Sequence, residues 1–146
     1  MPTNIDNVIL NKAGIIERSL NRMKEEFRAN PKLDNYTHID AMLLNIERAC
    51  QAAIDSALHL VTAHRLGIPQ TSAEAFILLQ KANFISEKTS RSMVGMTGFR
   101  NVAIHEYQNL EMDILRAIVE KEYLSIVSYC QEIGIAINLD KSLENN

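Results

Sequence analysis

Glycine, proline and cysteine are scarce in this sequence, and long apolar runs are missing. Its 146 residues include five glycines, three prolines and two cysteines, while 47% of the residues are hydrophobic. That composition excludes a disordered or low-complexity chain. No stretch approaches the roughly 20 apolar residues of a membrane-spanning helix, which argues against a transmembrane protein. The length fits one domain, which we place at residues 1–139, with residues 140–146 as a frayed tail.

From the sequence we expect neither a secretion signal nor a cysteine framework. Its first ten residues contain Asn4 and Asp6 where a signal peptide needs a basic start and then an apolar stretch. We therefore expect a cytoplasmic protein. Cys50 and Cys130 lie in amphipathic helical patterns, without the C-x-x-C or Cys/His spacing of a metal or redox site. We expect both to be buried free thiols.

The overall charge does not indicate a general nucleic-acid binder. Lysine and arginine number 15 against 18 acidic residues, so the formal net charge is −3. Residues 81–105 differ from the rest, because they hold four basic residues against one acidic residue, a net charge of +3. Any contact with RNA is therefore expected to be local, although such a run is also typical of a solvated helix face.

The apolar spacing predicts two long helices in the first half of the chain. Steps of three, four and seven residues mark one helical face from Ile5 to Phe27, and Asn30-Pro31 ends that helix. A second helix is expected from Asp34 or Thr37 to Gly67.

Three further helices are predicted in the second half. Thr71 and Glu74 form a T-x-x-E capping box for a short third helix, and Ser86 is the expected cap of a fourth. The last helix is predicted from about Leu110 to Ile133, where Gly134 ends it. Because no segment alternates with period two, we expect no sheet. The predicted fold class is all-α, an antiparallel bundle of about five helices.

Several catalytic constellations are absent from the sequence. A di-metal bundle needs Glu-x-x-His pairs, but none of the four histidines has a glutamate three residues before it. The chain also lacks a P-loop, a G-x-S-x-G elbow and a G-x-G-x-x-G fingerprint. We therefore expect neither a metal nor an organic cofactor.

Two local features receive structural interpretations. His59 lies four residues after Asp55, and we expect the two to pair on the surface of the second helix. Gly95 and Gly98 are expected either to permit close helix packing or to loosen the end of the fourth helix.

A cation, an amide, an imidazole and a phenol occur together in residues 99–107. On one straight helix, Arg100 and His105 lie about 140° apart, whereas Asn101 and His105 lie about 40° apart and Tyr107 about 20° from Arg100. For Arg100 and His105 to act on one phosphate, either the helix breaks between them or a second subunit completes the site. The purely structural alternative is a solvated arginine, a partly buried histidine and a tyrosine in the core.

The spacing R-N-x-x-x-H-x-Y of Arg100, Asn101, His105 and Tyr107 resembles the signature of the HEPN superfamily, specifically its HepT-like toxin branch. The similarity covers essentially the whole chain, including a second helix that contains aspartates, a short third helix and a long final helix. It implies an all-α homodimer that acts as a metal-independent endoribonuclease. It also implies the toxin role in a type VII toxin–antitoxin system, beside a minimal nucleotidyltransferase antitoxin.

The resemblance assigns roles that suit the chemistry of these side chains. His105 has an ordinary pKa of about 6.5 and can transfer protons near neutral pH, while Arg100 can bind phosphate oxygens through two parallel hydrogen bonds. Asn101 and Tyr107 are expected to orient the imidazole or the substrate. The resemblance further implies that Tyr107 accepts AMP from the antitoxin, so we expect its hydroxyl at the rim of the site.

The divergence of Arg100 and His105 leads us to expect a two-fold dimer that brings the two motif segments together. Val102, Ile104 and Met96 are the apolar residues expected at that contact. Two other functions remain open: a non-catalytic nucleotide-binding or regulatory partner of a nucleotidyltransferase, and a structural scaffold. A neighbouring nucleotidyltransferase gene fits the toxin and the regulatory partner alike, so only a cleavage assay separates those two.

Overall fold

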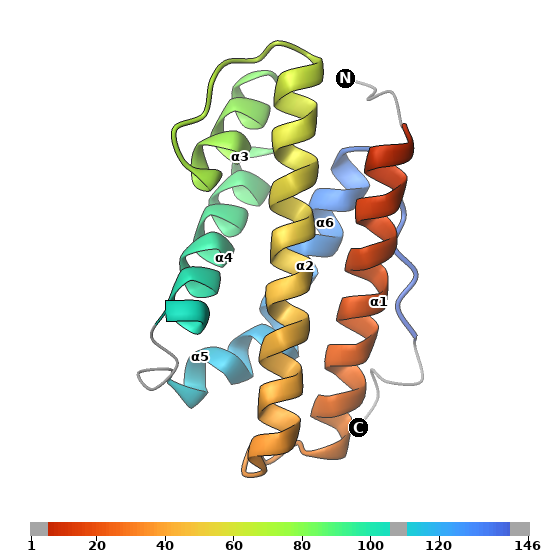
Figure 1. The fold of residues 1–146 in the computed structure, drawn as a ribbon, viewed down its shortest axis with the longest axis vertical. Helices are drawn as coiled ribbons and strands as arrows, with labels where there is room; N and C mark the ends of the chain where they lie inside the picture. The colour runs from red at the N-terminus through yellow and green to blue at the C-terminus, as the bar shows by residue number, and fades with distance from the viewer. Residues whose placement is uncertain (1–5, 106–110, 141–146) are drawn as a thin grey trace.

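The computed structural model describes residues 6–105 and 111–140, and all regular structure in these ranges is helical. Its elements are α1 (Asn7–Ala29), α2 (Tyr36–Ala63), α3 (Ser72–Lys81), α4 (Glu87–His105), α5 (Met112–Ala117), the π-helical turn η2 (Ile118–Glu122) and α6 (Leu124–Glu132). Figure 1 shows α1 and α2 as a long antiparallel hairpin, with α3 and α4 beside α2. The predicted all-α bundle is confirmed, with six α-helices in the described ranges. None of the helices described there is long and apolar enough to cross a membrane.

Side-chain caps begin α1 and fix the turn between α1 and α2. Asp6 begins α1 by accepting a hydrogen bond from the backbone N–H of Ile9 at 3.0 Å. Asn30 ends it, as predicted, and its side-chain oxygen accepts hydrogen bonds from two backbone N–H groups of the following turn. Asn35 then caps α2 by accepting from the N–H of Thr37. These caps satisfy donors that a helix start leaves unpaired.

The end of α2 differs from the prediction. The helix stops at Ala63, four residues before Gly67. Arg65 adopts a left-handed backbone with a φ of 54°, and the N–H of Leu66 donates to the carbonyl of Val61 at 2.9 Å. This closure usually uses glycine or asparagine in the left-handed position, which is why the sequence pointed to Gly67.

The predicted starts of α3 and α4 are confirmed. The Thr71 hydroxyl accepts a hydrogen bond from the N–H of Glu74 at 3.2 Å, and Ser86 accepts from the N–H of Thr89 at 3.1 Å. In a capping box, the Glu74 carboxylate would accept a hydrogen bond from the N–H of Thr71. It accepts instead from the N–H of Gln70, one residue earlier, at 2.7 Å. Both helices therefore begin where the sequence placed them.

The last helix is interrupted, contrary to the prediction of one regular helix to Ile133. The turn η2 separates α5 from α6. Tyr123 and Ile126 are buried, whereas Leu124 is 46% exposed. The buried positions nevertheless follow one another at steps of three and four residues on both sides of the turn, so one face of this segment packs on the core throughout. Gly134, with a φ of 104°, follows α6 as predicted.

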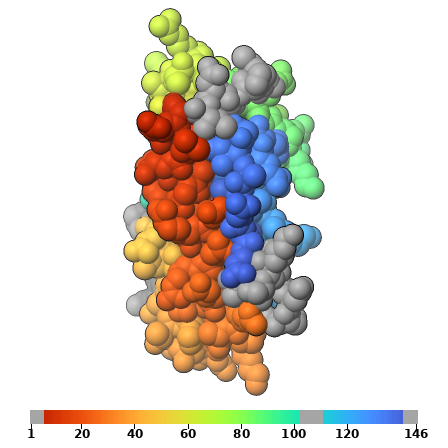
Figure 2. Space-filling model, turned by 90° about the vertical axis from the view of Figure 1, so that its right-hand side faces the viewer, coloured from red at the N-terminus to blue at the C-terminus, as the bar shows by residue number. Residues whose placement is uncertain are grey.

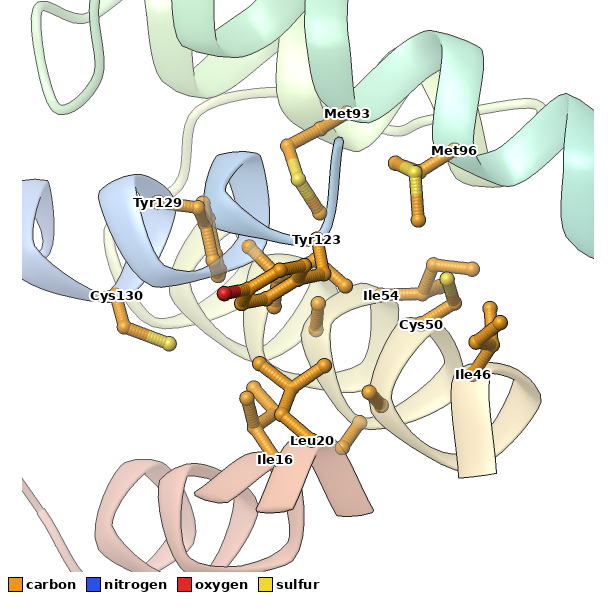
Figure 3. Close-up of a cluster of buried hydrophobic side chains, with 14 of the residues drawn as sticks. Ile16, Leu20, Ile46, Cys50, Ile54, Met93, Met96, Tyr123, Tyr129 and Cys130 are labelled. Carbon is orange, nitrogen blue, oxygen red and sulfur yellow. The ribbon is translucent and has the colours of Figure 1, made fainter. Parts of the chain in front are cut away.

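A single apolar cluster joins α1, α2, α3, α4 and the C-terminal helices. Figure 3 shows side chains from α1, α2, α4 and α6 packed around Tyr123. The two phenols of this core are hydrogen-bonded: Tyr123 accepts from Lys24 Nζ at 2.9 Å, and the Tyr129 hydroxyl lies 2.6 Å from Ser56 Oγ. The core therefore buries its polar atoms in pairs, as stable interiors require.

Residues 135–140 form an extended strap along α1, which Figure 2 shows as a blue segment lying against the red and orange helix. Asn138 donates its backbone N–H to Glu17 at 2.7 Å, and its carbonyl accepts from the Asn21 amide at 3.1 Å. The N–H of Asp140 donates to Asn21 Oδ1 at 2.7 Å, so this residue of the expected tail is hydrogen-bonded. Residues 141–146 lie outside the described part of the chain.

The predicted His59–Asp55 pair is wrong. His59 Nε2 lies 2.6 Å from Asp6 Oδ2, whereas Asp55 lies 3.4 Å from Lys12 Nζ. Packing of α1 on α2 brings the Asp6 cap to His59, and this tertiary contact replaces the one expected within a helix. Hydrogen bonds from the backbone of Ile9 and from His59 hold the pKa of Asp6 below its ordinary value.

Candidate active site

The helix α4 places Arg100 on its buried side. Ser90, Met93 and Thr97 are buried and follow one another at steps of three and four residues. Such residues share one helical face, and Arg100 continues the row three residues after Thr97. Its side chain is half-buried, whereas the next residue, Asn101, is exposed. The structure therefore rejects the interpretation of Arg100 as a fully solvated surface arginine.

The Arg100 guanidinium is only partly hydrogen-bonded. Its Nη1 lies 3.4 Å from Asn101 Oδ1, while its Nε is buried and has no hydrogen-bond partner among the residues that the structure describes. Leaving a buried donor unpaired costs about 1–3 kcal/mol, so a native structure that contains one needs a reason for it. An anion bound at Arg100 would supply the missing acceptor.

A buried thiol lies across from Arg100 on α2. Burial raises the pKa of Cys50 to about 12, and the positive charge of Arg100 opposes that rise. Burial also raises the pKa of Cys130 to about 12. Both cysteines are free and buried, as predicted, and thiols with such pKa values are not nucleophiles near neutral pH.

The backbone of α4 is helical without a break through His105. Five helical residues turn the chain by about 140°, so the backbone positions of Arg100 and His105 lie on different sides of α4. A helix break between them, one of the two arrangements that the sequence allowed, is therefore ruled out. Within one protomer the helix does not bring these two positions together.

Part of the motif lies beyond the described structure. The structure describes the backbone of Val102, Ile104 and His105 but not their side chains, and Tyr107 lies outside the described residues. Their assigned roles stay predictions. In the described ranges, no group of three His, Cys, Asp or Glu side chains is placed to hold a metal ion.

The described tyrosines differ sharply in exposure. Tyr123 and Tyr129 are 6% and 0% exposed, with hydroxyls engaged by Lys24 and Ser56, whereas Tyr36 at the start of α2 is 74% exposed. Of the three tyrosines that the structure describes, only Tyr36 offers its hydroxyl to another enzyme. It is therefore a natural control for any modification of Tyr107.

Two expectations near the motif are corrected. Met96 is 5% exposed and packs in the core of its own protomer (Figure 3), so it does not serve a contact between subunits. Gly95 and Gly98 are exposed, and a Cβ added at either would meet no atom within 4 Å. They therefore neither permit close packing in the protomer nor interrupt α4.

Sequence reasoning missed a groove between α4 and the C-terminal helices, which we call the α4–α6 groove. It has a volume of about 610 Å³, and its lining contains five serine or threonine hydroxyls, two lysines and two glutamates. One wall belongs to the first turns of α4, and the other to η2 and α6. Because the two walls lie far apart in the chain, no local sequence pattern indicated the groove.

Comparisons with known proteins match both the fold and the motif region. A family model described as ribonuclease HepT-like matches residues 9–133. The chain is 35% identical over 117 residues to an mRNA nuclease HepT of Shewanella oneidensis, covering 80% of this chain and 88% of that protein. It is 32% identical over 114 residues to a tRNA nuclease HepT of Aphanizomenon flos-aquae, covering 75% of this chain and 76% of that protein.

A solved structure agrees with these relatives. A tri-AMPylated HEPN toxin of Shewanella oneidensis, in complex with MNT antitoxin, superposes with a TM-score of 0.84 and 32% identity. The match covers 88% of this chain and 98% of that toxin. The family model spans the bundle together with the R-N-x-x-x-H-x-Y motif, and the relatives match over most of their length. The chain therefore belongs to the ribonuclease HepT-like family of HEPN proteins.

Proposed function

We propose that this chain is the toxin of a type VII toxin–antitoxin pair, and that it cleaves RNA in the cytoplasm as a metal-independent endoribonuclease. Arg100 and His105 are its catalytic residues, and Asn101 and Tyr107 orient the imidazole or the RNA. The observation that carries this proposal is the buried, unpartnered Nε of Arg100 within the motif. The names of the two nuclease relatives support the same assignment.

The chemistry needs only what these side chains provide. In metal-free cleavage, the 2′-hydroxyl next to the scissile phosphate attacks phosphorus, and the bond to the 5′-oxygen breaks. His105 transfers the proton that the nucleophile loses or the leaving oxygen gains. Arg100 stabilises the charge that develops on the phosphate oxygens, with its unpaired Nε as one of the donors. The product then ends in a 2′,3′-cyclic phosphate.

We assign the complete site to a homodimer. Because α4 is continuous, the backbone positions of Arg100 and His105 in one protomer lie on different sides of the helix axis. A two-fold axis beside the motif places Arg100 of one protomer near His105 of the other. This arrangement gives each phosphate one cation and one imidazole, and it gives the unpaired guanidinium a place at a shared cleft.

The decisive test is cleavage of single-stranded RNA by the purified chain in EDTA. We expect fragments with 2′,3′-cyclic phosphate ends, and at least a hundredfold slower cleavage by Arg100→Ala and His105→Ala. Arg91→Ala is the matched control, because Arg91 is an exposed arginine of the same helix that pairs with Glu87. It should retain cleavage within about twofold of the parent, since an exposed pair contributes little.

Three results would contradict the proposal. Activity that disappears in EDTA and returns with a divalent cation would overturn the metal-free mechanism. Full activity of both motif variants would move the site elsewhere. If the chain binds a nucleotidyltransferase but never cuts RNA, it is the non-catalytic regulatory partner instead.

We further propose that the cognate antitoxin, a minimal nucleotidyltransferase, silences the toxin by adenylylating Tyr107. The phenol oxygen attacks the α-phosphorus of ATP, pyrophosphate leaves, and the phenol proton passes to a base. The added AMP brings a bulky anion next to the motif, where it pairs with Arg100 and excludes the phosphate of RNA. The AMPylated state of the Shewanella toxin supports this regulation.

Mass spectrometry after incubation with the antitoxin and ATP tests this switch. We expect the parent to gain one or more AMP masses and Tyr107→Phe to gain none. Tyr36→Phe is the control, because Tyr36 is the exposed tyrosine of the described structure. Loss of the added mass in Tyr36→Phe, with modification retained in Tyr107→Phe, would transfer the acceptor role to Tyr36.

A further inference from the structure

The α4–α6 groove has the polar lining of a site for phosphates and sugars. Its hydroxyls come from both walls, with Ser92 on α4 and Ser125 and Ser128 on α6, all three half-buried. Contacts to the nucleic-acid backbone come mainly from lysine, arginine and such hydroxyls. The lining includes no aromatic side chain, so bases have no surface on which to stack.

Two lysines give the groove its available positive charge. Lys88 on α4 and Lys121 on η2 are exposed, and neither forms an ion pair with a residue that the structure describes. Of the two glutamates, Glu132 is already engaged, because its carboxylate accepts hydrogen bonds from Ser86 and Thr89 in the first turn of α4. Glu122 is exposed beside Lys121 on the same turn.

The groove lies along the helix that carries Arg100. Ser92 lies eight residues before Arg100, which is about 12 Å along the axis of α4. Lys88 lies twelve residues before Arg100, which is about 18 Å along the same axis. A stacked strand advances about 3.4 Å per nucleotide, and an unstacked strand advances more. A single strand with its scissile phosphate at Arg100 therefore reaches the groove within about two to four nucleotides.

We infer that the α4–α6 groove binds the sugar-phosphate backbone of the RNA substrate, two to four nucleotides from the cleaved bond. Lys88 and Lys121 contact phosphates there, and the serine hydroxyls contact phosphate oxygens or 2′-hydroxyls. The groove thereby adds affinity for longer strands without reading their sequence. This inference rests on the proposed ribonuclease function and adds a second binding region to it.

Salt-dependent binding tests the inference without requiring cleavage. The His105→Ala chain is titrated with a twelve-nucleotide single-stranded RNA in EDTA at several salt concentrations. Each phosphate contact contributes about 0.7 to the slope of log K against log salt, so adding Lys88→Gln and Lys121→Gln should lower the slope by about 1.4. The same relation predicts roughly tenfold weaker binding at 0.15 M salt. Arg18→Gln, which removes an exposed cation of α1, should leave the slope unchanged.

Cleavage kinetics distinguish a failure of this inference from a failure of the proposed ribonuclease function. In the otherwise unmodified chain, the two lysine substitutions should raise KM for the twelve-nucleotide RNA several-fold, with kcat unchanged. They should leave cleavage of a dinucleotide unaffected, because it is too short to reach the groove.

If the parent cuts RNA but the variant keeps its salt slope and its KM, the groove assignment is wrong and the ribonuclease function stands. If the variant instead loses affinity for the antitoxin alone, the groove is a protein-docking surface. Absence of cleavage by the parent would overturn the ribonuclease function, while the binding slope still decides the groove.

Discussion

The Nε of Arg100 is both buried and unpaired among the described residues, two properties that stability alone would not select together. Other buried polar groups of this core are matched, such as Lys24 with Tyr123. In the proposed site, a bound phosphate supplies an acceptor for Nε and so recovers free energy that the folded state alone does not gain. Under that proposal, Arg100 serves phosphate binding at a cost to stability.

Arg100→Ala should consequently remove activity at little cost in stability. Deleting the residue removes the desolvation penalty of the unpaired Nε while losing some packing of its aliphatic stem, so we expect a free energy of unfolding within about 1 kcal/mol of the parent. Met93→Ala on the same face should cost about 2–5 kcal/mol, because Met93 is 1% exposed in the core. Urea denaturation compares the two. Equal destabilisation by both substitutions would make Arg100 a structural residue.

The Ser56–Tyr129 pair should respond unequally to loss of either partner. Ser56 Oγ also donates to the carbonyl of Ala53 at 2.7 Å, so it stays hydrogen-bonded in Tyr129→Phe. Ser56→Ala instead leaves a fully buried phenol unpaired, which costs about 1–3 kcal/mol. We expect Ser56→Ala to lower the melting temperature more than Tyr129→Phe does. The reverse order would show that packing around the ring, and not the hydroxyl, dominates this pair.

Single residues show how far local sequence patterns reach. The spacing of Arg100, His105 and Tyr107 identified the candidate site, and the patterns around both cysteines predicted their burial. The partner of His59 was not predictable in this way, because Asp6 approaches it only when α1 packs on α2. The partial burial of Arg100 was not predicted either, since a charged residue on a helix is normally assigned to the solvent face.

At the scale of elements, caps were predictable and the π turn was not. Thr71 and Ser86 begin their helices with hydrogen bonds to residues three positions ahead, which is information contained in a few letters. The turn η2 has no such signature. The apolar spacing does not reveal it either, because the buried positions Val119, Tyr123 and Ile126 follow one another at ordinary helical steps of four and three residues.

Glu132 joins the two helices that form the α4–α6 groove. Its carboxylate accepts from the backbone and side chain of Ser86 and from the Thr89 hydroxyl, so it satisfies donors at the start of α4 from a position in α6. Glu132→Ala should therefore lower the free energy of unfolding by about 1–2 kcal/mol. Its exposed neighbour Gln131→Ala should change it by less than about 0.5 kcal/mol. Chemical denaturation that finds the two variants equal would refute a capping role for Glu132.

At the scale of the molecule, the antiparallel bundle followed from helical periodicity, whereas two features of the surface did not. The strap over residues 135–140 is held by Glu17 and Asn21, more than a hundred residues away in the sequence. The walls of the α4–α6 groove also come from distant segments. Both depend on tertiary packing, which patterns of neighbouring residues do not encode.

A composite site in a dimer predicts complementation between inactive variants. When Arg100→Ala and His105→Ala chains are refolded together in equal amounts, half of the dimers are mixed, and each mixed dimer contains one site with both residues intact. We expect about a quarter of the parental RNA cleavage from a mixture of two inactive proteins. If mixed dimers form, as differently tagged chains would reveal, and the mixture stays inactive, Arg100 and His105 do not meet across the subunit boundary.

The unbroken backbone of α4 also has a consequence for how activity depends on the concentration of the toxin. When the cation and the imidazole of a working site come from different chains, the lone protomer carries no complete site, and cleavage per chain rises with the concentration of the toxin until dimers saturate. A few molecules that escape inhibition in a cell are then mostly single and harmless, whereas a larger release is harmful out of proportion to its size. If the site is shared between two chains as proposed, the geometry of α4 makes the harm depend on a threshold concentration of the toxin.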